Sequence, residues 1–130
     1  MATITDVGMN YKQKLFSGLV TVPVKFFGLD GDNSGEVTTA NSPNTELTTN
    51  GALRKEAVVT NETSGSDFAI KFEQTWEFSG ALSIGAFFLA WSQSSGPNMY
   101  MRHRLSAPQP VDNEDIFTAV YVDHLTRPIT

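Results

Sequence analysis

Residues 67–91 read DFAIKFEQTWEFSGALSIGAFFLAW and hold much of the aromatic bulk of the chain. The first half alternates apolar with polar residues, and its apolar positions share one parity: Phe68, Ile70, Phe72, Trp76 and Phe78. This period of two is typical of a strand with one buried face. Ser79-Gly80 interrupts the run, and Leu82–Trp91 is then apolar at both parities, as in a strand covered on both faces. We therefore expect a long hairpin in the core.

The segments around this stretch complete a β-rich pattern. β-Branched and aromatic residues predict four further strands, at 20–29, 52–60, 99–105 and 116–125. Residues 5–17 predict a short amphipathic helix that Thr5 or Asp6 caps and Gly18 ends. About six strands with turn signals between them indicate a mainly β protein: an antiparallel β-sandwich with one short N-terminal helix.

Length and composition limit the classes of protein to consider. A chain of 130 residues matches one domain, spanning 1–130, and 40% hydrophobic with 18% charged residues is typical of a folded globular protein. The formal charge of -5 disfavours nucleic-acid binding, which draws on clustered Lys and Arg. The sequence has no cysteine, no signal-peptide pattern and no membrane-spanning run. These features predict no nucleic-acid or membrane partner and a chain that is cytoplasmic when made.

Three segments have no obvious packing partner in the sequence pattern. Residues 30–50 consist mainly of Asp, Gly, Ser, Thr, Asn and Pro, which predicts an extended exposed loop. A loop of this length is usually a binding element or is ordered by a neighbouring molecule. Together with residues 2–10 and the tail 126–130, this loop is a candidate contact element.

The start of that loop resembles half of a calcium-binding loop. The spacing D-x-D-x-S-G follows the first half of an EF-hand, with Asp30, Asp32, Ser34 and the carbonyl of Glu36 as the candidate ligands. However, Asn41 stands where the bidentate Glu belongs, and the flanks predict strand and coil. An Asp/Gly turn without metal is therefore the default, with calcium as the alternative.

Catalytic groups have no recognisable setting. His103 and His124 are the two side chains suited to general-base chemistry near neutral pH. The neighbours Asp123 and His124 point to opposite faces of a strand, which argues against a local dyad. We therefore expect a protein that is not an enzyme, with both histidines on a strand face or at an interface.

Two sets of residues are candidates for a subunit or particle interface. Tyr100, Arg102 and Arg104 alternate onto one face of a strand, where the arginines could pair with Glu73 or Glu77 or cross a subunit boundary. A second set lies on the odd face of the doubly apolar strand and must be covered, by the helix or by a neighbouring subunit: Phe87, Leu89 and Trp91.

The order of these parts resembles small virion structural proteins of tailed bacteriophages, related to the N-terminal domain of tail-collar fibre proteins. That group tends to show an "n-x-G-l-n" helix, a V-G-D/T-G turn, an "L-x-x-E-x-x-R" stretch, an "s-E-v-G-L-F" strand and a closing strand. The parallel segments here are Val7–Asn10, Phe27–Gly31, Leu47–Arg54, Leu82–Phe87 and Asp115–Leu125. Ser83 stands at the position of the acidic residue in the fourth motif.

The resemblance implies a non-enzymatic β-rich component of a virion. Its expected roles are head decoration (a cement protein) or a small tail or fibre-attachment protein. The expected partners are major capsid or tail proteins, and the chain itself would form a homo-oligomer, with a trimer favoured. Such an oligomer would bind the particle surface multivalently and without a cofactor. The alternative hypothesis from the residues is a carbohydrate-binding β-sandwich, assisted by calcium at Asp30 and Asp32.

Overall fold

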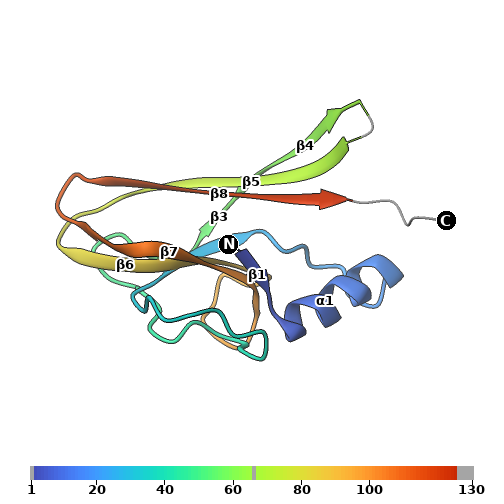
Figure 1. Cartoon of the computed structure of the whole chain (residues 1–130), viewed down its shortest axis with the longest axis horizontal. Helices are drawn as coiled ribbons and strands as arrows, with labels where there is room; N and C mark the ends of the chain where they lie inside the picture. Colours follow the sequence, from blue (N-terminus) through green and yellow to red (C-terminus); the bar gives the residue numbers. More distant parts are fainter. Residues whose placement is uncertain (1, 66, 126–130) are drawn as a thin grey trace.

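Two antiparallel β-sheets lie face to face in the computed structural model, which describes residues 2–65 and 67–125 (Figure 1). Within these residues, the larger sheet contains, in spatial order, β1 (Ala2–Ile4), β7 (Met99–Val111), β6 (Leu82–Ala90), β2 (Phe26–Asp30) and β3 (Lys55–Glu56). The smaller sheet contains β4 (Val58–Ser64), β5 (Asp67–Glu77) and β8 (Ile116–Leu125). This arrangement confirms the predicted antiparallel β-sandwich.

The predicted hairpin of residues 67–91 is wrong, because its two halves belong to different sheets. β5 pairs with β4 and β8, whereas β6 pairs with β2 and β7. The chain crosses between the sheets after β5 and returns after β7 at the same end of the sandwich. There the Phe78 amide donates to the Asp115 carbonyl at 2.9 Å, and the Glu114 amide donates to the Phe78 carbonyl at 2.7 Å. Alternation had identified the buried face of each strand, but it carries no information on which strand is the neighbour.

Aromatic side chains from both sheets meet in the core. Phe27 on β2 packs edge-on against Trp76 on β5 and Phe87 on β6, with ring centroids 6.3 and 5.7 Å apart. The buried indole of Trp76 donates to the Leu53 carbonyl at 3.0 Å. The odd face of β6 is thus covered by the opposite sheet of the same chain.

The other face of the larger sheet is covered by the segment 31–50, which we call the cover loop. Phe88, Ala90 and Met99 form a small buried cluster on this face, and Ala40 of the cover loop packs against it. A Cβ atom on Gly85 would lie 2.4 Å from the backbone of Asp32, so this close approach requires glycine. Many residues of the cover loop are exposed, as expected, but the loop has a packing partner within the chain, contrary to expectation. β6 is apolar at both parities because both of its faces are covered within one chain.

Helix α1 (Asp6–Ser17) confirms the predicted helix and packs on the end of the larger sheet (Figure 1). The Thr5 hydroxyl caps it by accepting from the Gly8 amide at 2.9 Å, and Gly18 ends it in the left-handed conformation. A Cβ on Gly8 would lie 2.2 Å from the Tyr100 carbonyl oxygen, so glycine lets the helix approach β7. Within the described residues, no helix is long and apolar enough to span a membrane.

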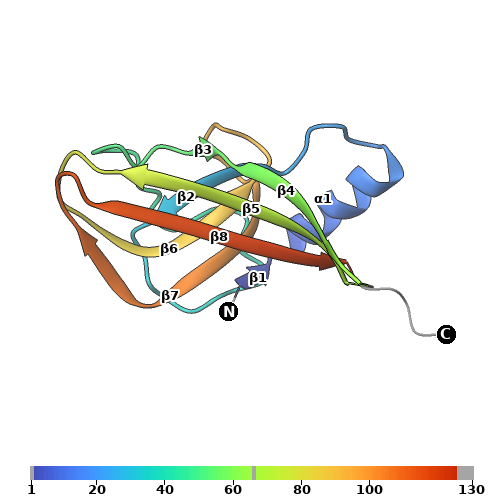
Figure 2. The same cartoon turned by 90° about the horizontal axis from the view of Figure 1, so that it is seen from above.

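Residues 2–10 have a packing partner, contrary to expectation, because β1 pairs with β7 and precedes α1 directly. The smaller sheet crosses over the larger one and extends past it towards α1 (Figure 2). At that end β4 and the adjoining part of β5 form a projecting ribbon, and all seven residues of β4 are exposed. The tail 126–130 lies outside the described residues.

Candidate functional site

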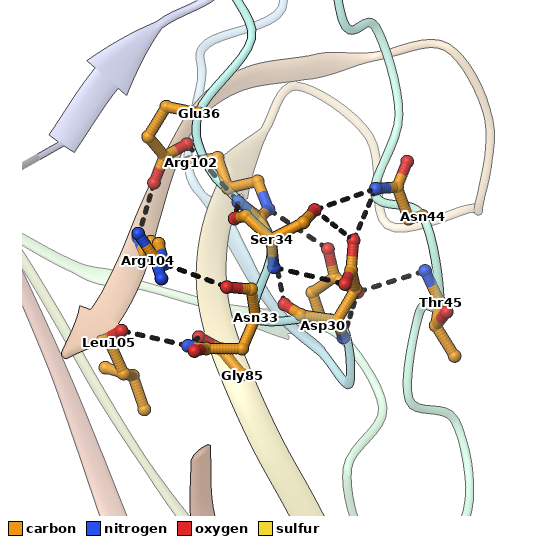
Figure 3. Close-up of polar contacts among 11 residues, drawn as sticks. Asp30, Asn33, Ser34, Glu36, Asn44, Thr45, Gly85, Arg102, Arg104 and Leu105 are labelled. Atoms are coloured by element: carbon orange, nitrogen blue, oxygen red, sulfur yellow. Dashed lines mark hydrogen bonds and ion pairs between the residues drawn. The ribbon is translucent and has the colours of Figure 1, made fainter. Parts of the chain in front are cut away.

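The guanidinium of Arg102 lies among the residues of the predicted metal site and donates hydrogen bonds to them (Figure 3). Its Nε donates to Asp30 Oδ2 at 3.1 Å, and Nη2 donates to the Asp32 carbonyl at 2.7 Å. Nη1 donates to the Ser34 carbonyl at 3.0 Å and to Glu36 Oε2 at 3.4 Å. Arg102 is 5% exposed and Asp30 is 0% exposed. The turn therefore binds a cation, and that cation is a side chain of β7.

In this geometry the Arg102 guanidinium competes with a calcium ion for the same turn. The second oxygen of the Asp30 carboxylate accepts from the amides of Asp32 and Thr45, each at 3.0 Å. A metal ion at this position would have to displace the Arg102 guanidinium from ligands it already holds. In the part of the chain that the structure describes, no group of three or more His, Cys, Asp or Glu side chains is arranged to hold a metal. Calcium binding stays a prediction to be tested.

Asp32 joins the two ends of the cover loop. Its carboxylate accepts from the side chains of Asn44 and Ser34 and from the Ser34 amide at 3.1 Å. These hydrogen bonds, that from Asn44 foremost, lower the pKa of Asp32 to about 2. The carboxylate is therefore ionised across the physiological range, and its hydrogen bonds fix the shape of the loop.

Arg104 anchors the same loop at a second point. Its Nε donates to the Asn33 carbonyl at 2.8 Å, and its backbone amide donates to the Glu36 carboxylate. The Asn33 side chain in turn donates to the carbonyls of Gly85 and Leu105, at 2.8 and 2.9 Å (Figure 3). The loop is held against β6 and β7 by an almost continuous polar network.

The predicted common face of Tyr100, Arg102 and Arg104 is wrong. The ladder between β6 and β7 shifts register between Leu89 and Ala90, which face Met101 and Met99. Tyr100 is the extra residue of this irregularity and turns into the core, while the arginines face the cover loop instead of Glu73 or Glu77. A bulge of this kind leaves no mark in the alternation of residue types.

The interface predicted on the odd face of β6 also needs correction. Phe87 is 6% exposed and Leu89 is 0% exposed, so neither can be reached by a partner while the sandwich is intact. Trp91 is half-buried under helix α1, where its ring stacks on Tyr11 with a centroid distance of 4.1 Å and an interplanar angle of 7°. The prediction that this face is covered is confirmed, but Phe87 and Leu89 are covered by the opposite sheet of the same chain, neither by the helix nor by a neighbouring subunit, whereas Trp91 is covered by α1.

Sequence reasoning missed a cleft of about 450 Å³ between α1 and the inner face of the smaller sheet, which we call the α1 cleft. Its walls are mostly apolar, and its residues come from six separate stretches of the chain: Lys12, Leu15, Pro23, Val24, Lys25, Val59, Asn61, Ile70, Phe72, Tyr100, Asp123 and Leu125. No local motif could have revealed a cavity assembled in this way.

The polar residues of the α1 cleft satisfy one another. The Tyr100 hydroxyl lies 3.3 Å from Asp123 Oδ2, and Lys12 Nζ lies 3.5 Å from the same oxygen. Burial, followed by the nearby Asp123 charge, raises the pKa of Tyr100 and raises the pKa of Tyr121 to about 12. Both phenols are neutral at physiological pH, and the charged groups that line the mostly apolar cleft are Lys12, Lys25 and Asp123.

Large apolar side chains are exposed around the mouth of this cleft, and we call them the apolar end. Phe16 is 97% exposed and Leu19 is 77% exposed, at the C-terminal end of α1. Val22, in the segment after the helix, is 53% exposed, and Val59 and Leu125, which line the cleft, are 46% and 49% exposed. A nearly bare phenylalanine next to an apolar cleft is typical of an interaction site.

The histidines lie on different sheets and show no shared chemistry. His103 on β7 stacks on Phe87 with a centroid distance of 4.9 Å, and burial lowers its pKa. It also lines an open groove of about 1140 Å³ between β7 and β8, whose β7 edge carries Pro110. His124 on β8 lies 3.4 Å from Asp67 at the surface. Both histidines occupy strand faces, as expected.

Comparison of the sequence with models of known protein families and with curated proteins found no match.

Proposed function

We propose that the chain is a non-enzymatic structural protein of a tailed-phage virion. It would act as a head-decoration protein or as a small tail or fibre-attachment protein, bound to major capsid or tail proteins as a homo-oligomer, with a trimer favoured. The phage assignment rests on the sequence resemblance. The observation that carries the assembly role is the apolar end, which exposes Phe16, Leu19 and their neighbours on an otherwise acidic chain.

The apolar end favours a protein partner over a small substrate. Burying apolar surface stabilises a complex by about 25 cal/mol per Å² before the costs of association are subtracted. The side chains converge from α1, β4 and β8, so one flat or grooved partner surface could cover them together. Several copies docked on a repetitive particle would gain further affinity through effective concentration.

The cover loop offers a second, rigid surface to a particle. Besides Arg102, the buried Arg54 fixes it through two 2.8 Å contacts with the Glu46 carboxylate. Arg54 also donates to the carbonyls of Ser92 and Ser94 at 2.9 Å, which ties a neighbouring loop to the same anchor. A loop ordered before binding loses little conformational entropy on docking, which suits a protein that works by attachment.

Mass photometry tests the proposal directly. The purified chain is measured alone and after mixing with capsids or tails of the phage that encodes it. We expect the particle mass to rise by the mass of a fixed number of copies of the chain. Two variants should lower that number: Val37→Lys, on the exposed part of the cover loop, and Phe16→Lys. Leu53→Lys changes an exposed apolar residue outside both surfaces and serves as the matched control. Particles whose mass is unchanged by the wild-type chain would contradict the proposal.

A further inference from the structure

We infer that the α1 cleft is filled by Phe16 of a second copy of this chain. The inference rests on the assembly part of the proposed function and is independent of the virion assignment. The cleft and Phe16 are the two most unusual features of the same end of the molecule. One is a cleft that none of the described residues fills, and the other is a large apolar side chain that the described residues leave exposed.

The contacts of helix α1 with the described residues do not explain why Phe16 is exposed. Helix α1 contacts β7 through the side that carries Gly8, and Tyr11 and Leu15 are turned towards the sandwich and partly buried. Phe16 points away from this side and is 97% exposed. A polar residue with higher helix propensity would serve better at an exposed position of the last helical turn. The phenyl ring is therefore explained by a contact outside the chain.

The cleft has the size and lining that a phenyl ring requires. A cavity of roughly 150 Å³ lined by aliphatic side chains accommodates a benzene ring. The α1 cleft measures about 450 Å³, which leaves room for Phe16 and for Leu19, which follows the Gly18 cap of the helix. Val24, Val59 and Ile70 supply aliphatic walls, and Phe72 offers an aromatic surface.

The protruding ring and the cleft form one continuous surface. Lys12 and Leu15 line the cleft and belong to the same helix as Phe16. A patch that contains both a protrusion and its receptacle can be exchanged between copies around a closed symmetry axis, as in most homo-oligomers. No unfolding or strand exchange is needed, because both features are at the surface.

Charges around the patch are arranged for self-association. Lys14 lies in the last turn of the helix, next to Lys12, which pairs with Asp123 of its own chain. The projecting ribbon of β4 and β5 carries Glu62 and Asp67 against one cation, Lys71, which lies 4.0 Å from Glu62. When the helix end of one copy enters the cleft of another, Lys14 approaches the carboxylates of that ribbon. Opposite charges at the rim favour this orientation over contacts between two helices or two ribbons.

Sedimentation velocity of the isolated full-length chain, over a range of concentrations, tests the inference. We expect a closed oligomer in the wild type. Phe16→Lys should raise the apparent dissociation constant at least about tenfold, because it removes a buried phenyl ring and places a charge in the cleft. Leu53→Lys, a change of an exposed apolar residue that does not line the cleft, should leave the constant unchanged. Val59→Trp should weaken association from the other side by filling the cleft with a residue of its own chain.

Thermal melts establish that each variant is folded. A wild type that stays monomeric at every soluble concentration would overturn the inference, and so would a Phe16→Lys variant that associates as strongly as Leu53→Lys. The two proposals can fail separately. A monomer that still binds particles would contradict the self-association but not the virion role. An oligomer that binds no particle would contradict the virion role but not the self-association.

Discussion

The guanidinium of Arg102 lies 3.1 Å from the carboxylate of Asp30, and both side chains are buried. The pair joins β7 to the end of β2 and fixes the place where the cover loop begins. Two charges removed from water gain little net stability from each other, because desolvation offsets most of the attraction. The pair is better understood as a device that selects one arrangement of the cover loop over the alternatives.

Arg102→Met should therefore be strongly destabilising although the pair itself contributes little. The change leaves Asp30 buried without a countercharge, which typically costs about 3–5 kcal/mol of unfolding free energy. Urea denaturation measures the loss. The double variant Arg102→Met, Asp30→Asn should recover part of it, since no charge then remains buried and the new carboxamide oxygen can still accept from the Thr45 amide. Equal stability of the single and double variants would contradict this account.

Calcium should leave the melting temperature of the wild type unchanged. Ligand that binds the folded state alone raises the melting temperature in proportion to the logarithm of its concentration. Here the oxygens of Asp30, Ser34 and Glu36 already hold Arg102. Thermal melts in calcium chloride, with magnesium chloride at equal ionic strength as the control, measure this. A rise specific to calcium would show that the metal displaces the guanidinium and would revive the calcium-assisted binding hypothesis.

Alkaline pH should weaken the fold through its buried phenols. Burial raises the pKa of Tyr121 to about 12 in the folded chain, against an ordinary value of 10.0 for a tyrosine. Between these values the unfolded chain loses its proton first, so stability is complete below about pH 10 and falls as the pH rises towards 12. Tyr121→Phe should flatten this fall. Urea denaturation between about pH 9 and pH 11 measures the free energy of unfolding of both proteins. If it falls equally steeply with pH in the wild type and in Tyr121→Phe, the loss of stability belongs to other groups, such as lysines.

Residue patterns predicted the helix and several strands where the signal is local, but they missed β1, started β2 too early at residue 20 and ended β7 too early at residue 105. Trp76 lies on the buried parity of β5 as predicted, and Thr5 and Gly18 bound the helix because capping depends on the residues at hand. β8 coincides with the predicted strand 116–125. Pairing was not predictable in the same way, because β5 and β6 are adjacent in sequence and still lie in different sheets.

The candidate sites illustrate the same limit. The sequence marked Asp30 and the carbonyl of Glu36 among the oxygen ligands of a cation. The Asp30 carboxylate does hold one, but that cation is Arg102 from a strand some seventy residues away, and Arg102 contacts the carboxylate of Glu36 instead of its carbonyl. The α1 cleft needed six segments to come together, and the exposure of Phe16 depends on how the helix docks, with Tyr11 stacked on Trp91. The sequence pattern does not distinguish Phe16 from the apolar residues that are buried. The position of the helix on the sandwich shows that Phe16 points outwards.

Tyr11→Ala should loosen helix α1 and thereby affect the apolar end. The change removes the stack on Trp91, worth about 0.5–1.5 kcal/mol beyond area burial, and a 2.6 Å hydrogen bond to the Val22 carbonyl, worth about 1 kcal/mol. Tyr11→Phe should lose only the hydrogen bond. Tryptophan emission should shift to longer wavelength in Tyr11→Ala through Trp91, because Trp76 is 0% exposed in the opposite sheet.

Met9→Ala is the matched control for this experiment, since Met9 is 48% exposed on the same helix. Its emission spectrum should stay that of the wild type. If the stack fixes the direction of Phe16, Tyr11→Ala should also weaken self-association while Met9→Ala does not, because a mobile helix must be ordered again each time the ring enters a cleft. A Tyr11→Ala variant with unshifted emission and wild-type association would show that the stack has no part in positioning the helix.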